Sequence, residues 1–200
     1  MTSALSIIRN EHRALTAVIR SLQWLARTVA RGDVQADYDV LGLLLDYIDA
    51  FPNRLHHPKE DQYLFKALRA RSPGVCDTLD ALEAEHVRGD ELMRHLRHHL
   101  LRCRLADVAA RKSFATAVDE YADFHWKHMR TEEDIVMPLA EQSLTAADWR
   151  AIDQAFEAND DPLLGAAPKR EFERLFQLIV NVAPAPVGVG APWRGPADRA

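Results

Sequence analysis

The feature that most constrains this chain is the spacing of its apolar residues, which recur every three or four positions along four long stretches. That period matches the α-helix, and no alternating strand pattern is present in the sequence. Residues that end helices separate the stretches at Gly32, at Ser72-Pro73-Gly74 and, more softly, at Leu105-Ala106-Asp107. The pattern predicts long helices at about 4–30, 35–70, 75–104 and 108–141. Four such helices with short connections predict an all-α fold, an up-down-up-down four-helix bundle.

The same pattern divides the chain into three parts. Residues 1–141 are predicted to form the bundle, where Pro52 and Pro58 should kink the second helix or open a turn, and Pro138 should end or kink the fourth. Residues 142–183 are predicted to form a C-terminal helical extension, with a helix from Ala146 capped by Thr145, a loop at 159–168 and a last helix at about 168–182. Residues 184–200 are rich in proline and glycine, so we expect a flexible tail.

Composition argues against several classes of partner. The net charge of -5, with no basic face, argues against nucleic acid. No apolar run approaches the ~20 residues of a membrane span, and the N-terminal stretch carries charges where a secretion signal would be apolar. Cys76 and Cys103 share a predicted helix and would lie roughly 40 Å apart, too far for a disulfide. A reduced, cytoplasmic protein is therefore expected.

Each of the four apolar stripes is interrupted by a histidine, at His12, His56, His86 and His128. On the second and fourth helices a glutamate, Glu60 or Glu132, follows one turn later on the same face. In an antiparallel bundle with ~1.5 Å rise per residue, all four histidines reach similar heights, about 13–21 Å from one end. Four imidazoles and two carboxylates should therefore converge on one layer of the core.

Two glutamates in an apolar core need a compensating positive charge, because burying a carboxylate costs several kcal/mol. No lysine or arginine occupies the stripes near this layer, and a pair of divalent cations would supply the charge. A metal-free polar network is the competing interpretation. Imidazole and carboxylate ligands in a bundle core suit iron, with manganese and zinc as competitors.

Several neighbouring residues leave alternatives open. His57 and Asp61 form a rival pair one residue out of phase with His56 and Glu60, and their face is more polar upstream. His125 lies one turn before His128 and could line a pocket. Adjacent acidic residues project about 100° away from the stripes, so salt bridges on flanking faces are their expected role. These acidic residues are Glu11, Glu85 and Glu133.

Four motifs, NEHRAL, HHPKEDQYLF, EAEHVRGDEL and HWKHMRTEEDIVMP, resemble those of the hemerythrin-like, HHE cation-binding family over about residues 4–141. The resemblance implies a cofactor of two iron ions with an oxo or hydroxo bridge, and Glu60 and Glu132 spanning both irons. The implied ligands are His12, His56, Glu60, His86, His128 and Glu132. The segment after about residue 145 is similar to extensions of bacterial members.

The sequence departs from oxygen-carrying hemerythrins, which have a fifth histidine where this chain has Asp90. Asp90 could supply an oxygen ligand or stay off the metal and leave a more open coordination position. The resemblance implies a protein that binds or senses dioxygen or a related small ligand such as nitric oxide. The alternatives are a redox role in nitric oxide or peroxide detoxification or iron–sulfur cluster repair, and an iron store or interaction module. The sequence identifies no redox partner and no homo-oligomer, and it leaves open whether the protein is an enzyme.

Overall fold

The computed structural model of the chain describes residues 3–32, 37–104, 108–158, 181 and 189. The predicted loop at 159–168, and nearly all of the predicted last helix and tail, lie outside the described residues. The part that is described is helical and contains no strand. The expected fold class, an all-α helical bundle, is confirmed.

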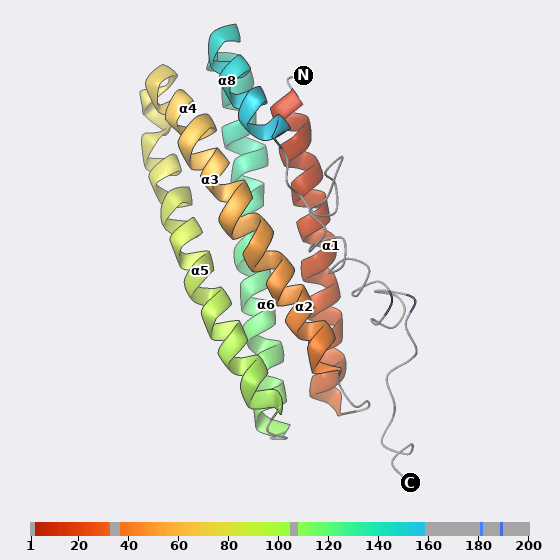
Figure 1. Cartoon of the computed structure of the whole chain (residues 1–200). Coiled ribbons are helices and arrows are strands. Elements are labelled where there is room, and N and C mark those ends of the chain that lie inside the picture. Colours follow the sequence, from red (N-terminus) through yellow and green to blue (C-terminus); the bar gives the residue numbers. More distant parts are fainter. Residues whose placement is uncertain (1–2, 33–36, 105–107, 159–180, 182–188, 190–200) are drawn as a thin grey trace.

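Four long helical columns lie side by side, and each runs antiparallel to the one before it in the chain (Figure 1). The first is α1, Ser3–Arg31, and it ends at Gly32, whose φ of 75° places it in the left-handed region that favours glycine after a helix. The second column runs without interruption through five elements: α2 Tyr38–Ile48, η1 Asp49–His56, α3 His57–Lys59, η2 Glu60–Phe65 and α4 Lys66–Arg71. After η3, Pro73–Val75, the third column is α5, Cys76–Arg104. The fourth comprises α6 Val108–Thr131, η4 Glu132–Val136 and α7 Met137–Ser143.

Three stretches of these columns, η1, η2 and η4, are wider π-helical turns. Proline lacks an N–H group and clashes with the carbonyl four residues earlier, so it disrupts the regular α-helical ladder. Pro52 lies inside η1, and the backbone N–H of His57 bonds to the Pro52 carbonyl, five residues back. Pro138 follows η4 in the first turn of α7. The prolines therefore widen the columns locally, where the sequence predicted kinks or opened turns.

A further helix, α8 at Ala146–Glu157, packs across the end of the bundle where α1 begins (Figure 1). It begins as predicted, because the Thr145 side chain accepts the backbone N–H of Asp148 and the Asp148 carboxylate accepts that of Thr145. Asp153 Oδ1 accepts the N–H of Ala4 at 2.8 Å, which satisfies one of the free donors at the start of α1. Ser3 Oγ donates to Glu157 at 2.8 Å. These two hydrogen bonds attach α8 to the first turn of α1.

The buried apolar side chains form two clusters. One fills the half of the bundle around Leu22, Leu44 and Phe114. The other fills the half around Leu5, Leu68 and Leu79, and α8 adds Trp149, Ile152 and Phe156 to it. Among the described residues, no helix is both long and apolar enough to cross a membrane.

Candidate metal centre

A layer of buried polar side chains contains all six residues that the sequence placed at one height. They come from all four columns, and each is at most 7% exposed: His12, His56, Glu60, His86, His128 and Glu132. Their nitrogen and oxygen atoms form two overlapping groups whose members lie within 4.8 Å of one another, His12-His56-Glu60 and Glu60-His86-His128-Glu132. The structure thus brings together the six side chains that the helical pattern grouped.

The two glutamates lie between two pairs of histidines, His12–His56 and His86–His128. Glu60 Oε1 is 3.4 Å from His56 Nε2, and its other oxygen is 3.7 Å from His86 Nε2. Glu132 Oε2 is 3.3 Å from His12 Nε2, and its other oxygen is 3.1 Å from His128 Nε2. Each carboxylate thus faces one imidazole of the first pair with one oxygen and the second pair with the other. This is the arrangement that a bridging carboxylate requires.

Several of these inward-facing atoms lack a hydrogen bond of proper geometry. His12 Nε2, Glu60 Oε2 and both oxygens of Glu132 are buried without one. A buried polar group with no partner costs about 1–3 kcal/mol, and more when it is charged. Metal bonds of ~2.0–2.2 Å place neighbouring ligand atoms roughly 3 Å apart, close to the separations observed here. The donor set therefore fits bound metal cations, which would satisfy the atoms that no protein group satisfies.

A carboxylate holds the other ring nitrogen, Nδ1, of each of the four histidines. An ionised carboxylate only accepts, so Nδ1 is the protonated donor and Nε2 is left to face the centre. The Nδ1 distances are 2.6 Å from His56 to Glu11, 2.8 Å from His12 to Glu133, 2.9 Å from His86 to Asp61 and 2.9 Å from His128 to Glu85. Carboxylates placed in this way fix the orientation of metal-binding imidazoles and increase their basicity.

This role was not predicted from the sequence, where Glu11, Glu85 and Glu133 were assigned to salt bridges on flanking faces. In the structure each holds an imidazole of another column, and Glu11 is only 2% exposed. A signal was present in the sequence. Every one of the four carboxylates is adjacent to a candidate ligand, in the pairs Glu11-His12, Glu60-Asp61, Glu85-His86 and Glu132-Glu133. A residue beside an inward-facing one points along the flank, toward the back of the neighbouring column's imidazole.

Burial by itself would lower the pKa of these imidazoles, but the carboxylates around them outweigh it. Asp61 and Glu132 raise the pKa of His86 to about 9, and Glu132 and Glu85 raise that of His128 to about 10. The pKa of His12 and His56 is raised as well. Burial would raise the pKa of Glu132, but His128 and His12 hold it well below its usual value. Without metal at neutral pH, protons on the imidazoles therefore balance the carboxylates.

Of the rival pair, Asp61 lies behind His86, on its Nδ1, whereas His57 lies at the centre. His57 is buried, its ring stacks on that of His86 at 4.1 Å, and its nitrogen belongs to a group with His86 and His128 within 4.8 Å. Burial and the neighbouring imidazoles lower the pKa of His57 well below its usual value. His125 is buried one turn before His128, and neither ring nitrogen has a hydrogen-bond partner within the described chain.

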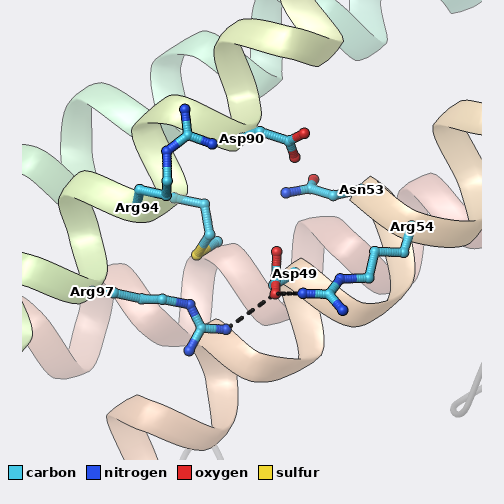
Figure 2. A pocket seen from close by; sticks show the side chains of 7 residues that line it. Asp49, Asn53, Arg54, Asp90, Arg94 and Arg97 are labelled. Atoms are coloured by element: carbon cyan, nitrogen blue, oxygen red, sulfur yellow. Dashed lines mark hydrogen bonds and ion pairs between the residues drawn. The ribbon is translucent and has the colours of Figure 1, made fainter.

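Asp90 lies elsewhere. It is exposed on α5 and lines a pocket between α5 and η1 with Asn53, Arg94 and Arg97, as Figure 2 shows. The residue of α5 that faces the core is its neighbour Gly89, and a Cβ atom at that position would lie 3.9 Å from His125 Nε2. The structure thus does not bring Asp90 into the polar layer, and an imidazole from α6 lies against the glycine instead.

Comparison with known proteins agrees with this geometry. The model of the hemerythrin HHE cation-binding domain matches residues 3–140, so the chain belongs to that family. It is a member of a cation-binding family with a buried histidine and glutamate cluster that can hold metal. A search of curated proteins found no significant match. The matched residues span the four columns and end before α8.

Proposed function

We propose that this chain is a non-haem di-iron protein whose centre binds or senses dioxygen or a related small ligand, nitric oxide or peroxide. The observation that carries the proposal is the position of Glu60 and Glu132, each between one imidazole of the His12–His56 pair and one of the His86–His128 pair. Each histidine pair would hold one iron ion, and the two glutamates would bridge them together with an oxo or hydroxo group.

Imidazole nitrogen and carboxylate oxygen are ligands that iron accepts in helical bundles. Zinc favours closed tetrahedral sites of four ligands, whereas more donors than that meet here. Two ferrous ions bring four positive charges and the two glutamates cancel two of them, so the centre favours an anionic or electron-accepting ligand. When bound, the iron pair would supply two electrons to such a ligand.

The protein's own residues would orient the centre and exclude water. The carboxylates on Nδ1 keep every Nε2 directed inward. Apolar clusters close the layer on both sides, and Phe51 and Phe156 lie 6.3 Å and 6.5 Å from the His56 ring. An apolar surrounding of this kind restricts solvent access to a metal centre.

The test is the metal content of protein purified without oxygen, followed by its absorption spectrum when air is admitted. We expect about two irons per chain and new near-ultraviolet and visible bands on exposure to oxygen. Substoichiometric zinc, or no spectral change after reconstitution with iron, would refute a reactive di-iron centre.

The same sample separates binding from a redox role. Stable, reversible spectral changes with dioxygen or nitric oxide support binding or sensing. Steady consumption of nitric oxide or peroxide with an added electron donor indicates the alternative, a detoxifying di-iron protein. Transfer of iron to an apo iron–sulfur protein indicates cluster repair.

A further inference from the structure

The centre holds a fifth inward-facing imidazole, that of His57, in addition to the four in the proposed ligand set. We propose that His57 is a third imidazole ligand to the metal ion held by His86 and His128. The inference rests on the proposed two-metal centre but not on the identity of the metal. It assigns to the second column the imidazole that the third column lacks at Asp90.

The position of His57 relative to the second pair supports this assignment. Its ligand nitrogen lies within 4.8 Å of those of His86 and His128. Its ring is nearly parallel to that of His86, at an interplanar angle of 10°, and edge-on to His128 with ring centroids 5.5 Å apart. All three rings are buried, so the three nitrogens share one small space from which solvent is excluded.

Local backbone geometry explains how two successive histidines can serve the same centre. His56 ends the π-helical stretch η1, and His57 begins the short α3, which contains Pro58 and is followed by η2. Wider turns on both sides rotate the column, and both side chains are buried, at 3% and 4% exposure. His56 then faces Glu60 and His12, whereas His57 faces His86. A regular 3.6-residue helix would separate the two by about 100°.

His125 provides the contrast. It is the other buried histidine outside the proposed ligand set, and its ring lies 6.2 Å from His128 and 6.4 Å from His57. It belongs to none of the groups of potential ligands found among the described residues. The two histidines are thus matched in residue type and burial, but only His57 has a nitrogen within reach of a shared metal.

The assignment makes the two metal positions unequal. The position with His57 would have donors from three histidines and two glutamates, His57, His86, His128, Glu60 and Glu132. The other would have donors from two histidines and the same glutamates, His12, His56, Glu60 and Glu132. An incoming small ligand would therefore bind on the His12–His56 side, where Phe51 and Phe156 contact the His56 ring.

The full chain loaded with cobalt(II) tests the proposal by proton NMR. A metal-bound imidazole gives one solvent-exchangeable, strongly shifted N–H resonance, so the spectrum counts ligated histidines. We expect one such resonance for each of His12, His56, His57, His86 and His128. In His57→Gln one resonance should disappear, and the second cobalt should bind at least tenfold more weakly, as expected for a group at or near the metal. The matched control, His125→Gln, should keep every resonance and both affinities.

The outcomes separate the two proposals. Failure of the wild-type chain to bind two cobalt ions contradicts the two-metal centre itself. Two bound cobalt ions with a wild-type count that lacks the extra resonance contradict only the role of His57. That role is contradicted equally if His125→Gln, and not His57→Gln, loses a resonance. If circular dichroism shows that His57→Gln is unfolded, the wild-type count decides alone.

Discussion

At the scale of single residues, the carboxylates behind the imidazoles determine which ring nitrogen faces the centre. Glu11 is the most deeply placed of them, because it is buried on α1 and accepts from His56 Nδ1 at 2.6 Å. The interaction fixes the tautomer of His56 and the orientation of its ring, which also contacts Phe51 and Phe156. Glu11 is therefore expected to influence metal binding although its carboxylate does not belong to the groups of potential ligands.

Glu11→Gln should weaken the binding of one of the two metal ions by about 10–100-fold, the usual effect of losing a partner of this kind. The amide keeps the shape of the side chain but not its charge, so the His56 imidazole becomes a poorer ligand. Competition with a chromophoric chelator measures the change. Glu91→Gln, which alters an exposed ion pair with Arg88, is the control. Equal affinities in the two variants would show that Glu11 has no such role.

Residue identities at the centre were largely predictable from the sequence, because helical periodicity and rise per residue determine which side chains share a face and a height. These two regularities group His12, His56, Glu60, His86, His128 and Glu132. The partners of Nδ1 were not predictable from the same information. They depend on how each column is rotated about its own axis, which the stripe of a single helix does not specify.

At the scale of elements, the π-helical stretches coincide with the candidate centre. His56 ends η1, Glu60 begins η2 and Glu132 begins η4. Such wider turns are rare and frequently mark functional positions. The prolines at 52, 58 and 138 indicated irregular helix, but a 3.6-residue pattern cannot show how far a wider turn rotates the residues after it. For that reason the sequence pattern left His56 and His57 as alternatives for the inward-facing position, whereas both are buried in the structure.

The other element of consequence is α8, which lies outside the matched family domain. Phe156 is fully buried, and its ring lies edge-on to that of His56 with the ring centroids 6.5 Å apart. The Lys59 ammonium lies over the Phe156 ring, 5.8 Å from its centroid. Arg71 further ties the start of α8 to the second column through Asp148, at 2.9 Å. The C-terminal extension therefore covers the His56 side of the polar layer.

Phe156→Ala should release metal to a chelator faster than the wild-type chain does, because water gains access to the His56 side. The substitution should also cost about 3–5 kcal/mol of stability, as is typical for a buried phenylalanine. Phe114→Ala is the matched control, since Phe114 is equally buried but belongs to the other apolar cluster. Comparable stability loss in both variants, with faster metal release only in Phe156→Ala, is the expected result. Equal release rates would contradict a covering role for α8.

At the scale of the whole molecule, a charged layer separates two apolar clusters. In the metal-free protein the layer is balanced by protons, because the pKa of His86 is about 9 and that of His128 about 10. Metal binding replaces those protons, since imidazoles bind metal in their neutral form. The stability of the metal-free bundle and its capacity to bind metal are therefore both linked to pH: protonation of the imidazoles stabilises the metal-free fold and competes with metal.

Raised pKa values stabilise the metal-free fold only while the imidazoles are protonated. This contribution is complete below the unfolded pKa of about 6.5. It is lost as the pH rises through about 9 for His86 and about 10 for His128. The metal-loaded fold lacks this dependence, so the difference in Tm between the two forms should widen from about pH 6.5 to pH 10. Thermal melts of loaded and chelated protein across this range measure it. A constant difference would contradict the proton-balanced layer.

The contact between the first and last turns of the described chain also sets an order of events during synthesis. Ser3 and Ala4 can form these hydrogen bonds only after Glu157 and Asp153, about 150 positions later, have been synthesised. Contacts between such distant residues form late, because a long loop must close first. Every candidate ligand, the last being Glu132, leaves the ribosome before any residue of α8. On a nascent chain all six candidate ligands are therefore outside the ribosome before α8 can pack against the side of the polar layer that it covers in the finished protein.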